Sequence, residues 1–381
     1  MKIAFIHDDR KISTGAHYIN DLISSKMTER GVKVKNFYPR APLFDAPRHL
    51  KGLRNILFFY SLLENKDEIL KCDLIQGTTY TPLTFLPFKI PVVSHFGSTT
   101  YGFLKNVPLA SSMEKELRSY IIDLKKQKVI PEVNTPNRRA LRDITEVEIM
   151  VAKEANGVIA TSEGVKNELV ENKVPVEKIE VIHNAIEDFW FEKSFVFKTG
   201  TQRKIIYLAR LSDDVFTFKL KGLDRAMDIF SKFSDTEKIV IIITKNVKLS
   251  EYLLKKFPNL KLYVNISKEQ IYNLFQELSG SVLFLPSRYE GFSLSLVEAM
   301  SQGIIPVAYP VGVAPEIITD NKNGFLARNQ KEAKVYIENI LKMDEEKCKS
   351  LSTSAYATSL NFRADIMVDK MISFYKKLLN K

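Results

Sequence analysis

Short apolar runs alternate with segments of helical period along the first half of the chain. Lys2–His7 is a predominantly apolar run, and residues 16–30 carry apolar side chains at helical spacing. Residues 73–77, 91–97 and 179–185 repeat the strand pattern. Strands that alternate with helices predict parallel β-α-β units with right-handed crossovers.

The same alternation restarts after residues 186–200, a stretch without periodicity that we interpret as a linker. The clearest strands of the second half are residues 203–210, 238–244 and 281–285. We therefore predict an α/β protein with two Rossmann-like, doubly wound parallel-sheet domains that face each other across a cleft. The expected domains are residues 1–190 and 191–360, and we expect a helix at 361–381 to pack back on the first domain.

Composition narrows the function classes. The 381 residues carry a net charge of +11, and a basic surface suits phosphorylated substrates, anionic lipid headgroups or nucleic acid. The sequence holds no nucleic-acid-binding motif, so nucleic acid is not an expected partner. No apolar run reaches the ~18 residues of a membrane span, the N-terminus does not resemble a signal peptide, and Cys72 and Cys348 are too few for a metal site. We expect a cytoplasmic protein.

One stretch combines candidate chemistry with the end of a strand. Glu290 and Glu298 bracket a glycine-containing turn directly after the expected strand 281–285, and a helix is expected to open at Ser295. The carboxyl edge of a parallel sheet, beside a helix start, is where such folds bind phosphorylated ligands. Alternatively, Ser295 and Glu298 form a capping box and Glu290 is a solvated loop acid.

Two cations fall at the same expected edge of the sheet. Arg210 ends the strand 203–210, and Lys221 follows a polar loop. Two cations beside a helix start suit a pyrophosphate, whereas carboxylates repel that anion and suit the hydroxyl groups of a sugar. The four side chains together describe a site for a nucleotide sugar, although any one of them alone is better explained as surface charge.

The segment from Glu290 to Met300 resembles the acid–seven residues–acid motif of the retaining glycosyltransferases of family 4, which have the GT-B fold of two Rossmann-like domains. Further similar segments, which extend the resemblance over most of the chain, are Pro286-Ser287, Gly303 with Pro306-Val307, Arg210-Leu211 with Lys221-Gly222, and Val181 to Ala185. The resemblance implies a metal-independent, retaining transfer of sugar from a UDP- or GDP-sugar donor, without a cofactor. The implied acceptor is a hydroxyl of a glycan, a lipid-linked molecule or a protein, as in cell-surface polysaccharide biosynthesis.

The resemblance also implies roles for the matched residues. Glu290 would contact the donor sugar and Glu298 the ribose, while Arg210 and Lys221 would hold the diphosphate and stabilise the leaving group. The loop before Lys221 is longer than in most relatives, so Lys219 is an alternative cation. The other candidates are His95 near the donor sugar, Gly15 beside the phosphate, Asn184 in the segment that enters the linker, and the backbone of Gly291, Phe292, Ser293, Leu294 and Ser295. His95 and Gly15 can equally be a structural histidine and a turn residue.

Two stretches suggest an anionic membrane surface as a partner, and hence a peripheral position on the inner face of the membrane. Arg48–Leu63 has basic residues ahead of an apolar and aromatic run, and Lys125–Arg142 is a concentrated basic patch. The first can equally be a core helix and the second a solvated face. The competing function is a non-catalytic GT-B-like subunit that binds glycans or stabilises a partner glycosyltransferase.

Overall fold

The computed structural model of the protein describes residues 1–7, 15–39, 60–109, 112–130, 138–212 and 214–380. The chain divides into two compact units. The first unit comprises residues 1–104, 137–187 and 362–381, and the second comprises residues 105–136 and 188–361. The chain therefore passes from one unit to the other at residues 104/105, 136/137, 187/188 and 361/362.

The first unit is built on a six-stranded parallel sheet in the order β2-β1-β3-β4-β5-β6. Its strands are β1 Lys2–Ile6, β2 Lys33–Phe37, β3 Leu74–Thr78, β4 Val92–Phe96, β5 Gly157–Ala160 and β6 Ile179–Val181. Its helices are α1 Gly15–Glu29, α3 Lys66–Ile69, most of α4 Thr100–Asn106, α6 Arg138–Glu154, α7 Glu163–Glu171 and α16 Ala364–Leu379. Every residue of β4 and β5 is buried, as a sheet covered on both faces requires.

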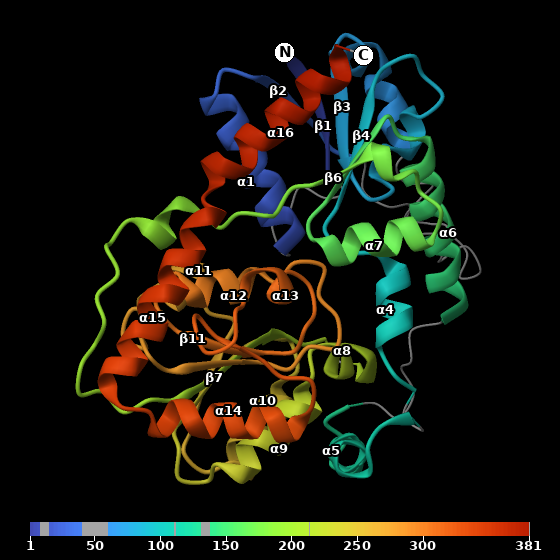
Figure 1. Cartoon of the computed structure of the whole chain (residues 1–381). Helices are drawn as coiled ribbons and strands as arrows, with labels where there is room; N and C mark the ends of the chain where they lie inside the picture. The colour runs from blue at the N-terminus through green and yellow to red at the C-terminus, as the bar shows by residue number, and fades with distance from the viewer. Residues whose placement is uncertain (8–14, 40–59, 110–111, 131–137, 213, 381) are drawn as a thin grey trace. The chain divides into compact units, whose positions relative to one another are not determined.

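Helix α16 returns from the far end of the sequence to pack on α1 (Figure 1, red beside blue). Arg30, directly after α1, forms ion pairs with Asp365 at 3.0 Å and Asp369 at 2.9 Å. The backbone N–H of Ile186 donates to the carbonyl of Phe362 at 3.0 Å, which joins the two ends of this unit. The C-terminal segment is thus a structural part of the first unit.

The second unit contains a second six-stranded parallel sheet, in the order β12-β11-β10-β7-β8-β9. Its strands are β7 Ile205–Arg210, β8 Lys238–Ile243, β9 Leu260–Val264, β10 Val282–Leu285, β11 Ile305–Ala308 and β12 Phe325–Leu326. Its helices are α5 Lys115–Lys126, α8 Val215–Leu220, α9 Leu223–Lys232, α10 Val247–Lys256, α11 Lys268–Phe275, α12 Leu294–Met300, α13 Ala314–Ile317, α14 Gln330–Lys342 and α15 Glu345–Ser359. Helices α9, α10 and α14 cover one face of this sheet, and α11, α12 and α13 cover the other (Figure 1).

The position of α5 differs from the division expected from the sequence. Residues 105–136 were expected in the first domain, yet they belong to the second unit, where α5 packs on α9. Tyr120 of α5 hydrogen-bonds to Ser231 at 3.1 Å, and Asp123 accepts hydrogen bonds from Tyr252 and Lys256 of α10. The buried face of α5 joins the hydrophobic core of the second unit, so burial of that face determines where the segment lies.

The stretch 186–200, predicted as a linker, contains the crossing between the units at 187/188. The residues after the crossing pack on the second unit, because Trp190 is completely buried and its carbonyl accepts a hydrogen bond from Gln302 at 2.9 Å. Helices α5, α8 and α10 were not predicted from the sequence.

The stretches proposed to contact a membrane have different outcomes. Residues 48–59 of the segment Arg48–Leu63 lie outside the described residues, and Leu62 is fully buried. The basic patch Lys125–Arg142 is divided, because Lys125, Lys126 and Lys128 belong to the second unit and Arg142 to the first. No helix in the described ranges is long and apolar enough to cross a bilayer.

Candidate functional site

The candidate site of the second unit is built from three loops at the carboxyl edge of adjacent strands. The loops follow β7, β10 and β11, which lie side by side in the sheet. Residues 211–222 follow β7, residues 286–293 follow β10, and residues 309–313 follow β11. Because all strands are parallel, the three loops emerge at one edge.

Two glycines allow these loops to approach one another closely. Gly222 has a φ of +64°, and a Cβ at this position would lie 2.2 Å from the carbonyl oxygen of Pro286. Gly312 has a φ of +59°, and its Cβ would lie 2.5 Å from the carbonyl oxygen of Phe292. Only glycine satisfies both the left-handed backbone and the close contact. The loop after β10 is therefore held between its two neighbours.

This packing places Lys221 against Glu290. Lys221 Nζ lies 2.7 Å and 3.0 Å from the two carboxylate oxygens of Glu290, and Ser287 Oγ donates to the same carboxylate at 2.7 Å. The side chains of Lys221 and Glu290 are 26% and 14% exposed, so both groups are partly accessible to a ligand. The sequence prediction that Lys221 and Glu290 lie at one edge agrees with this geometry.

A buried ion pair joins the loop after β10 to the first turn of α9. Arg288 forms a bidentate pair with Asp224, at 2.7 and 2.6 Å, and also donates to the carbonyl of Lys219 at 2.7 Å. The two side chains are 5% and 0% exposed, so each charge is neutralised almost entirely by the other. Sequence reasoning missed this pair, since its partners are 64 residues apart and no spacing rule connects them.

The second acid of the motif, Glu298, lies on α12. Its carboxylate lies 3.0 Å from Lys268 Nζ at the start of α11, and only 6% of its side chain is exposed. The helix begins after Ser293, with no side-chain cap, so the alternative capping box of Ser295 and Glu298 is wrong. Ser293 itself has φ 92° and ψ 80°, a conformation of high energy for a residue with a Cβ, and such strain gathers at functional sites.

The two remaining cations occupy distinct positions. Arg210 is the last residue of β7 and is partly exposed at the carboxyl edge. Lys219 is 5% exposed, and its Nζ donates to the carbonyl of Pro108. Lys221, and not Lys219, therefore contacts Glu290.

In the first unit, His95 and Asn184 are both buried. His95 lies one residue before the end of β4, and burial lowers the pKa of its imidazole to about 4, with Asn184 beside the ring opposing the shift only in part. The imidazole is therefore neutral at physiological pH. His95 Nδ1 and Asn184 Oδ1 have no hydrogen-bond partner among the described residues, which is uncommon for buried polar atoms.

Gly15 and the backbone candidates take simple structural positions. Gly15 is the first residue of α1, and the preceding residues 8–14 lie outside the described part of the chain. Gly291 and Phe292 precede the turn at Ser293, while Leu294 and Ser295 form the first turn of α12. The second unit thus brings Lys221, on the loop after β7, into contact with Glu290, on the loop after β10.

Sequence reasoning also missed Glu148 of α6. Its carboxylate accepts hydrogen bonds at 2.8 Å from both the backbone N–H and the hydroxyl of Thr100. Burial raises the pKa of Glu148 to about 7, although the bonds from Thr100 oppose the shift. Glu148 supports the start of α4, just beyond the strand that carries His95.

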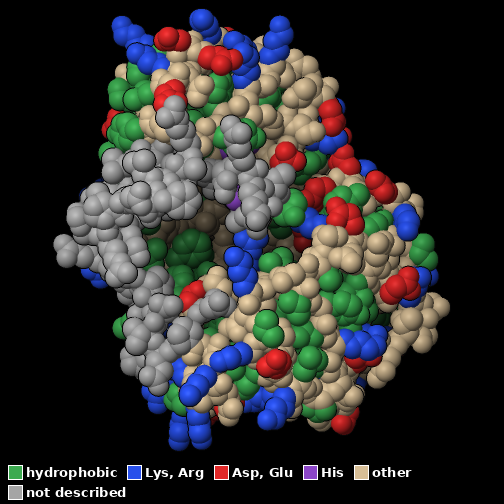
Figure 2. Space-filling model, turned by 180° about the vertical axis from the view of Figure 1, so that it is seen from behind, with side chains coloured by type: hydrophobic (Ala, Val, Ile, Leu, Met, Phe, Trp, Pro, Cys, Tyr) green, Lys and Arg blue, Asp and Glu red, His purple; other side chains and the backbone are tan. Residues whose placement is uncertain are grey.

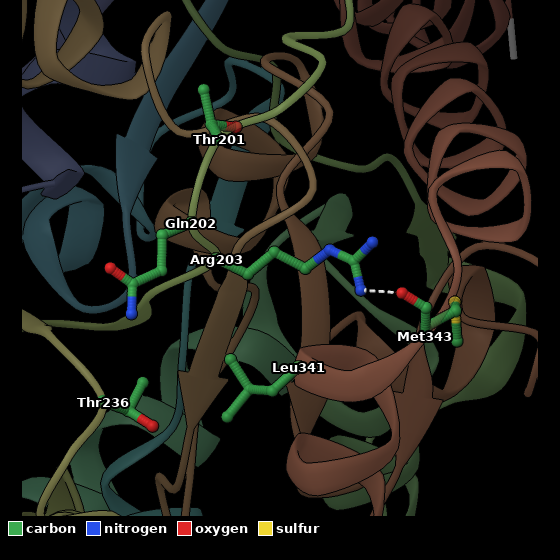
Figure 3. Close-up of a pocket in the computed structure, with 6 residues that line it drawn as sticks. All are labelled: Thr201, Gln202, Arg203, Thr236, Leu341 and Met343. Atoms are coloured by element: carbon green, nitrogen blue, oxygen red, sulfur yellow. Dashed lines mark hydrogen bonds between the residues drawn. The ribbon is translucent and has the colours of Figure 1, made fainter.

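A pocket of about 300 Å³ in the second unit lies away from this edge (Figure 3). It includes Arg203, two residues before β7 begins, so it adjoins the opposite end of that strand. Arg203 donates to the carbonyls of Ile340 at 2.7 Å and of Met343 and Asp344 near the end of α14. Its guanidinium has a structural role there. Within the described ranges, no group of three or more His, Cys, Asp or Glu side chains is placed to hold a metal ion.

Two Rossmann-like units, with Lys221 and Glu290 on carboxyl-edge loops of the second and Glu298 on the following helix α12, define the class of GT-B proteins. Comparison with family models identifies the family. Residues 24–188 match the model described as glycosyltransferase family 4, and residues 188–358 match that of glycosyl transferases group 1. The chain belongs to the family 4 type of GT-B glycosyltransferases.

Individual relatives are distant. The chain is 25% identical over 244 residues to an uncharacterized 41.2 kDa protein in the cps region of Klebsiella pneumoniae, covering 60% of this chain and 64% of the relative. It is 26% identical over 183 residues to the GDP-mannose:cellobiosyl-diphosphopolyprenol alpha-mannosyltransferase of Xanthomonas campestris, covering 46% and 45%. These matches thus span between about half and two thirds of the relatives' own length.

Among solved structures, the HepE protein of Anabaena in complex with UDP-glucose superimposes with a TM-score of 0.68 and 16% identity. The superposition covers 99% of this chain and 100% of that protein. At this identity the likeness establishes the fold alone, and it confirms the predicted GT-B architecture.

Proposed function

We propose that the protein is a retaining glycosyltransferase that moves a sugar from a UDP- or GDP-sugar to a hydroxyl group of a glycan, lipid-linked or protein acceptor. Membership of the family supports the reaction class. The observation that carries the proposal is the contact of Lys221 with Glu290, because it joins a phosphate-binding cation and a hydroxyl-binding acid at one sheet edge.

In this proposal each charged group has one task. Lys221 and Arg210 bind the diphosphate and stabilise the negative charge that grows on it as the sugar leaves. Glu290 accepts hydrogen bonds from the donor sugar, and Glu298 accepts them from the ribose. The pair of Glu298 with Lys268, at 3.0 Å, holds that carboxylate in position.

The transfer itself requires few protein groups. The bond between the sugar's anomeric carbon and the phosphate oxygen breaks, and the acceptor oxygen forms the new bond on the same face. The leaving phosphate oxygen takes the proton of the acceptor hydroxyl. The chain needs no separate general base for this step, and its contribution is to position the reactants and to stabilise the diphosphate charge.

In this proposal His95 of the first unit contacts the donor sugar. His95 is buried and neutral, and its Nδ1 lacks a partner among the described residues. A neutral imidazole can donate one hydrogen bond and accept another, as a sugar hydroxyl requires. We also assign to the first unit the binding of the acceptor. The lipid-linked acceptor class follows from the activity named for the Xanthomonas relative.

The test is a donor screen with the purified full chain. Nucleoside diphosphate release is measured with a panel of UDP- and GDP-sugars, and binding of each donor is measured by calorimetry in parallel. We expect one donor to bind and turn over, and Glu290→Ala and Lys221→Ala each to abolish turnover with an unchanged circular dichroism spectrum. Absence of binding and turnover with every donor would reject the proposal, and glycan binding without turnover would favour a non-catalytic subunit.

Linkage analysis of the product tests the stereochemistry. Proton NMR of the first product formed shows whether the anomeric configuration of the donor is kept. An inverted product would leave the transferase activity standing but remove the retaining mechanism.

A further inference from the structure

The outer surface formed by α5 and α10 combines positive charge with exposed apolar side chains. Hereafter this basic–apolar surface means Lys115, Ile122, Lys126 and Lys128 of the α5 segment, and Lys245, Val247, Lys248, Leu254 and Lys255 of the α10 segment. All nine of these residues are exposed. Both segments belong to the second unit.

Side-chain contacts hold the two helices together. Asp123 of α5 accepts hydrogen bonds from Tyr252 and Lys256 of α10, and Asn246, the residue that caps α10, donates to the carbonyl of Val129 at 2.7 Å. Leu249 and Leu253 of α10 face the core and are fully buried. The remaining sides of both helices are therefore available to solvent.

Charge is concentrated here. Residues 112–130 and 244–256 contain nine Lys and Arg and four Asp and Glu, a net charge of +5 out of +11 for the chain. Asp123 is already paired with Lys256, whereas the six lysines of the surface make no ion pair with other described residues. On the face drawn in Figure 2, Lys and Arg side chains gather along the lower edge, the end of the second unit where Figure 1 labels α5, α9 and α10.

The apolar side chains are unusually exposed for their size. Val247 is 69% exposed, Ile122 56% and Leu254 53%, which places them among the most exposed large apolar residues of the described chain. Single exposed apolar residues are ordinary, but three of them among six unpaired lysines form a combined surface. Polyanions such as nucleic acid would use the lysines and gain nothing from the apolar side chains.

We propose that the basic–apolar surface docks the protein on an anionic lipid bilayer. The lysines attract the headgroups, at a range set by the Debye length, and the apolar side chains enter the boundary between headgroups and acyl chains. This assigns the membrane contact to a helix pair of the second unit. The surface keeps Lys126 and Lys128 of the predicted patch Lys125–Arg142 and leaves out the stretch Arg48–Leu63. The proposal does not depend on sugar transfer.

Co-sedimentation of the full chain with vesicles tests the proposal. One set of vesicles contains phosphatidylglycerol and phosphatidylcholine in equal parts, and the other contains phosphatidylcholine alone. We expect binding to the first set, a decrease with added salt, and little binding to the second. Lys248→Glu with Lys255→Glu should lower the partition coefficient by about 30-fold or more, since each basic residue near the surface contributes roughly a factor of five.

A second variant and a matched control separate lipid docking from general charge effects. Val247→Ser with Leu254→Ser should lower vesicle binding without changing the net charge. The control, Lys331→Glu with Val335→Asp, alters an exposed lysine and a valine that is 51% exposed on α14 of the same unit, and it should bind vesicles as the unchanged protein does. Glu290→Ala should also bind normally, so loss of activity and loss of docking are distinguishable.

Three results would overturn the proposal. One is no binding to anionic vesicles at low salt, and another is equal loss of binding in the control variant. The third is a dimer in sedimentation velocity that the Val247→Ser, Leu254→Ser variant abolishes while vesicle binding persists, which would assign the surface to a second copy of the chain.

Discussion

Asp224→Asn should cost the second unit a large part of its stability. The substitution keeps the shape of the side chain but leaves the Arg288 guanidinium as an unneutralised charge in a site where only 5% of that side chain is exposed. Breaking a buried ion pair in this way costs about 3–5 kcal/mol. Arg288 retains its bond to the carbonyl of Lys219 at 2.7 Å, so we expect the lower part of this range.

The single tryptophan of the chain, Trp190, makes the assay selective. It is fully buried in the second unit, with Tyr272 and Phe275 against its ring. Urea denaturation followed by tryptophan fluorescence therefore reports the unfolding of that unit. With a urea dependence of about 1–3 kcal/mol/M, a loss of about 3 kcal/mol moves the midpoint by at least about 1 M.

An exposed pair in the first unit provides the control. Arg30 and Asp369 are 40% and 60% exposed, and surface pairs contribute only about 0–1 kcal/mol. Asp369→Asn should therefore leave the tryptophan transition unchanged. If Asp224→Asn lowers the free energy of unfolding by less than about 1 kcal/mol and the folded structure stays intact, the two charges do not neutralise each other in a buried site, and the reasoning is refuted.

Three further results are expected. Lys221→Met should abolish donor turnover, whereas Lys219→Met should retain most of it; a more severe effect of Lys219→Met would transfer the phosphate role to that residue. Gly222→Ala should lower the free energy of unfolding by about 1–3 kcal/mol, because residue 222 has a left-handed backbone. It should also reduce turnover, because the added Cβ would lie 2.2 Å from the carbonyl oxygen of Pro286 and displace the loop that carries Lys221. Unchanged kinetics would contradict the close packing. The pKa of Glu148 is raised to about 7. Its contribution to the free energy of unfolding, up to about 3 kcal/mol, is therefore present below about pH 4.5 and is lost as pH rises toward 7. The pKa of His95 is lowered to about 4, and its contribution is lost as pH falls from 6.5 to 4. Thermal melts followed by circular dichroism should therefore show a stronger rise in stability between pH 4.5 and 7 for Glu148→Gln than for the unchanged protein. Parallel pH profiles of the two proteins would show that the Glu148 carboxyl does not contribute to the pH dependence of stability.

The sequence predicts the sheets well, because buried parallel strands are nearly continuous apolar runs. Strand β8 is an example, with five of its six residues buried. Helix α5 escapes this pattern, since its apolar side chains at Leu117, Ile121 and Leu124 stand in a strongly charged segment. Periodicity also cannot tell which sheet such a helix will cover, and α5 covers the second one.

The candidate site divides in the same way. The acids, the cations and their position at strand ends follow from local sequence, whereas the contacts between loops do not. The positions of Lys219 and Lys221 illustrate the limit. Helix α8 ends at Leu220 and Gly222 turns the chain into the left-handed region, so two lysines only two positions apart reach Pro108 and Glu290 respectively. Which lysine contacts Glu290 is determined by where a short helix ends.

The pair of Lys221 and Glu290 also explains how an acid can belong to an anion site. Two carboxylates beside a diphosphate would repel it, at about 4 kcal/mol for charges 4 Å apart in a medium of effective dielectric constant 20. Here each acid already has its own cation, Lys221 for Glu290 and Lys268 for Glu298. In the proposed complex, a diphosphate would therefore meet acids whose charge is largely neutralised, and it would share Lys221 while Glu290 turns its oxygens to the sugar hydroxyls. Neutralising Lys268 should for this reason weaken donor binding even though Lys268 is assigned no contact with the phosphates, and calorimetry of Lys268→Met with the donor identified in the screen measures that effect directly.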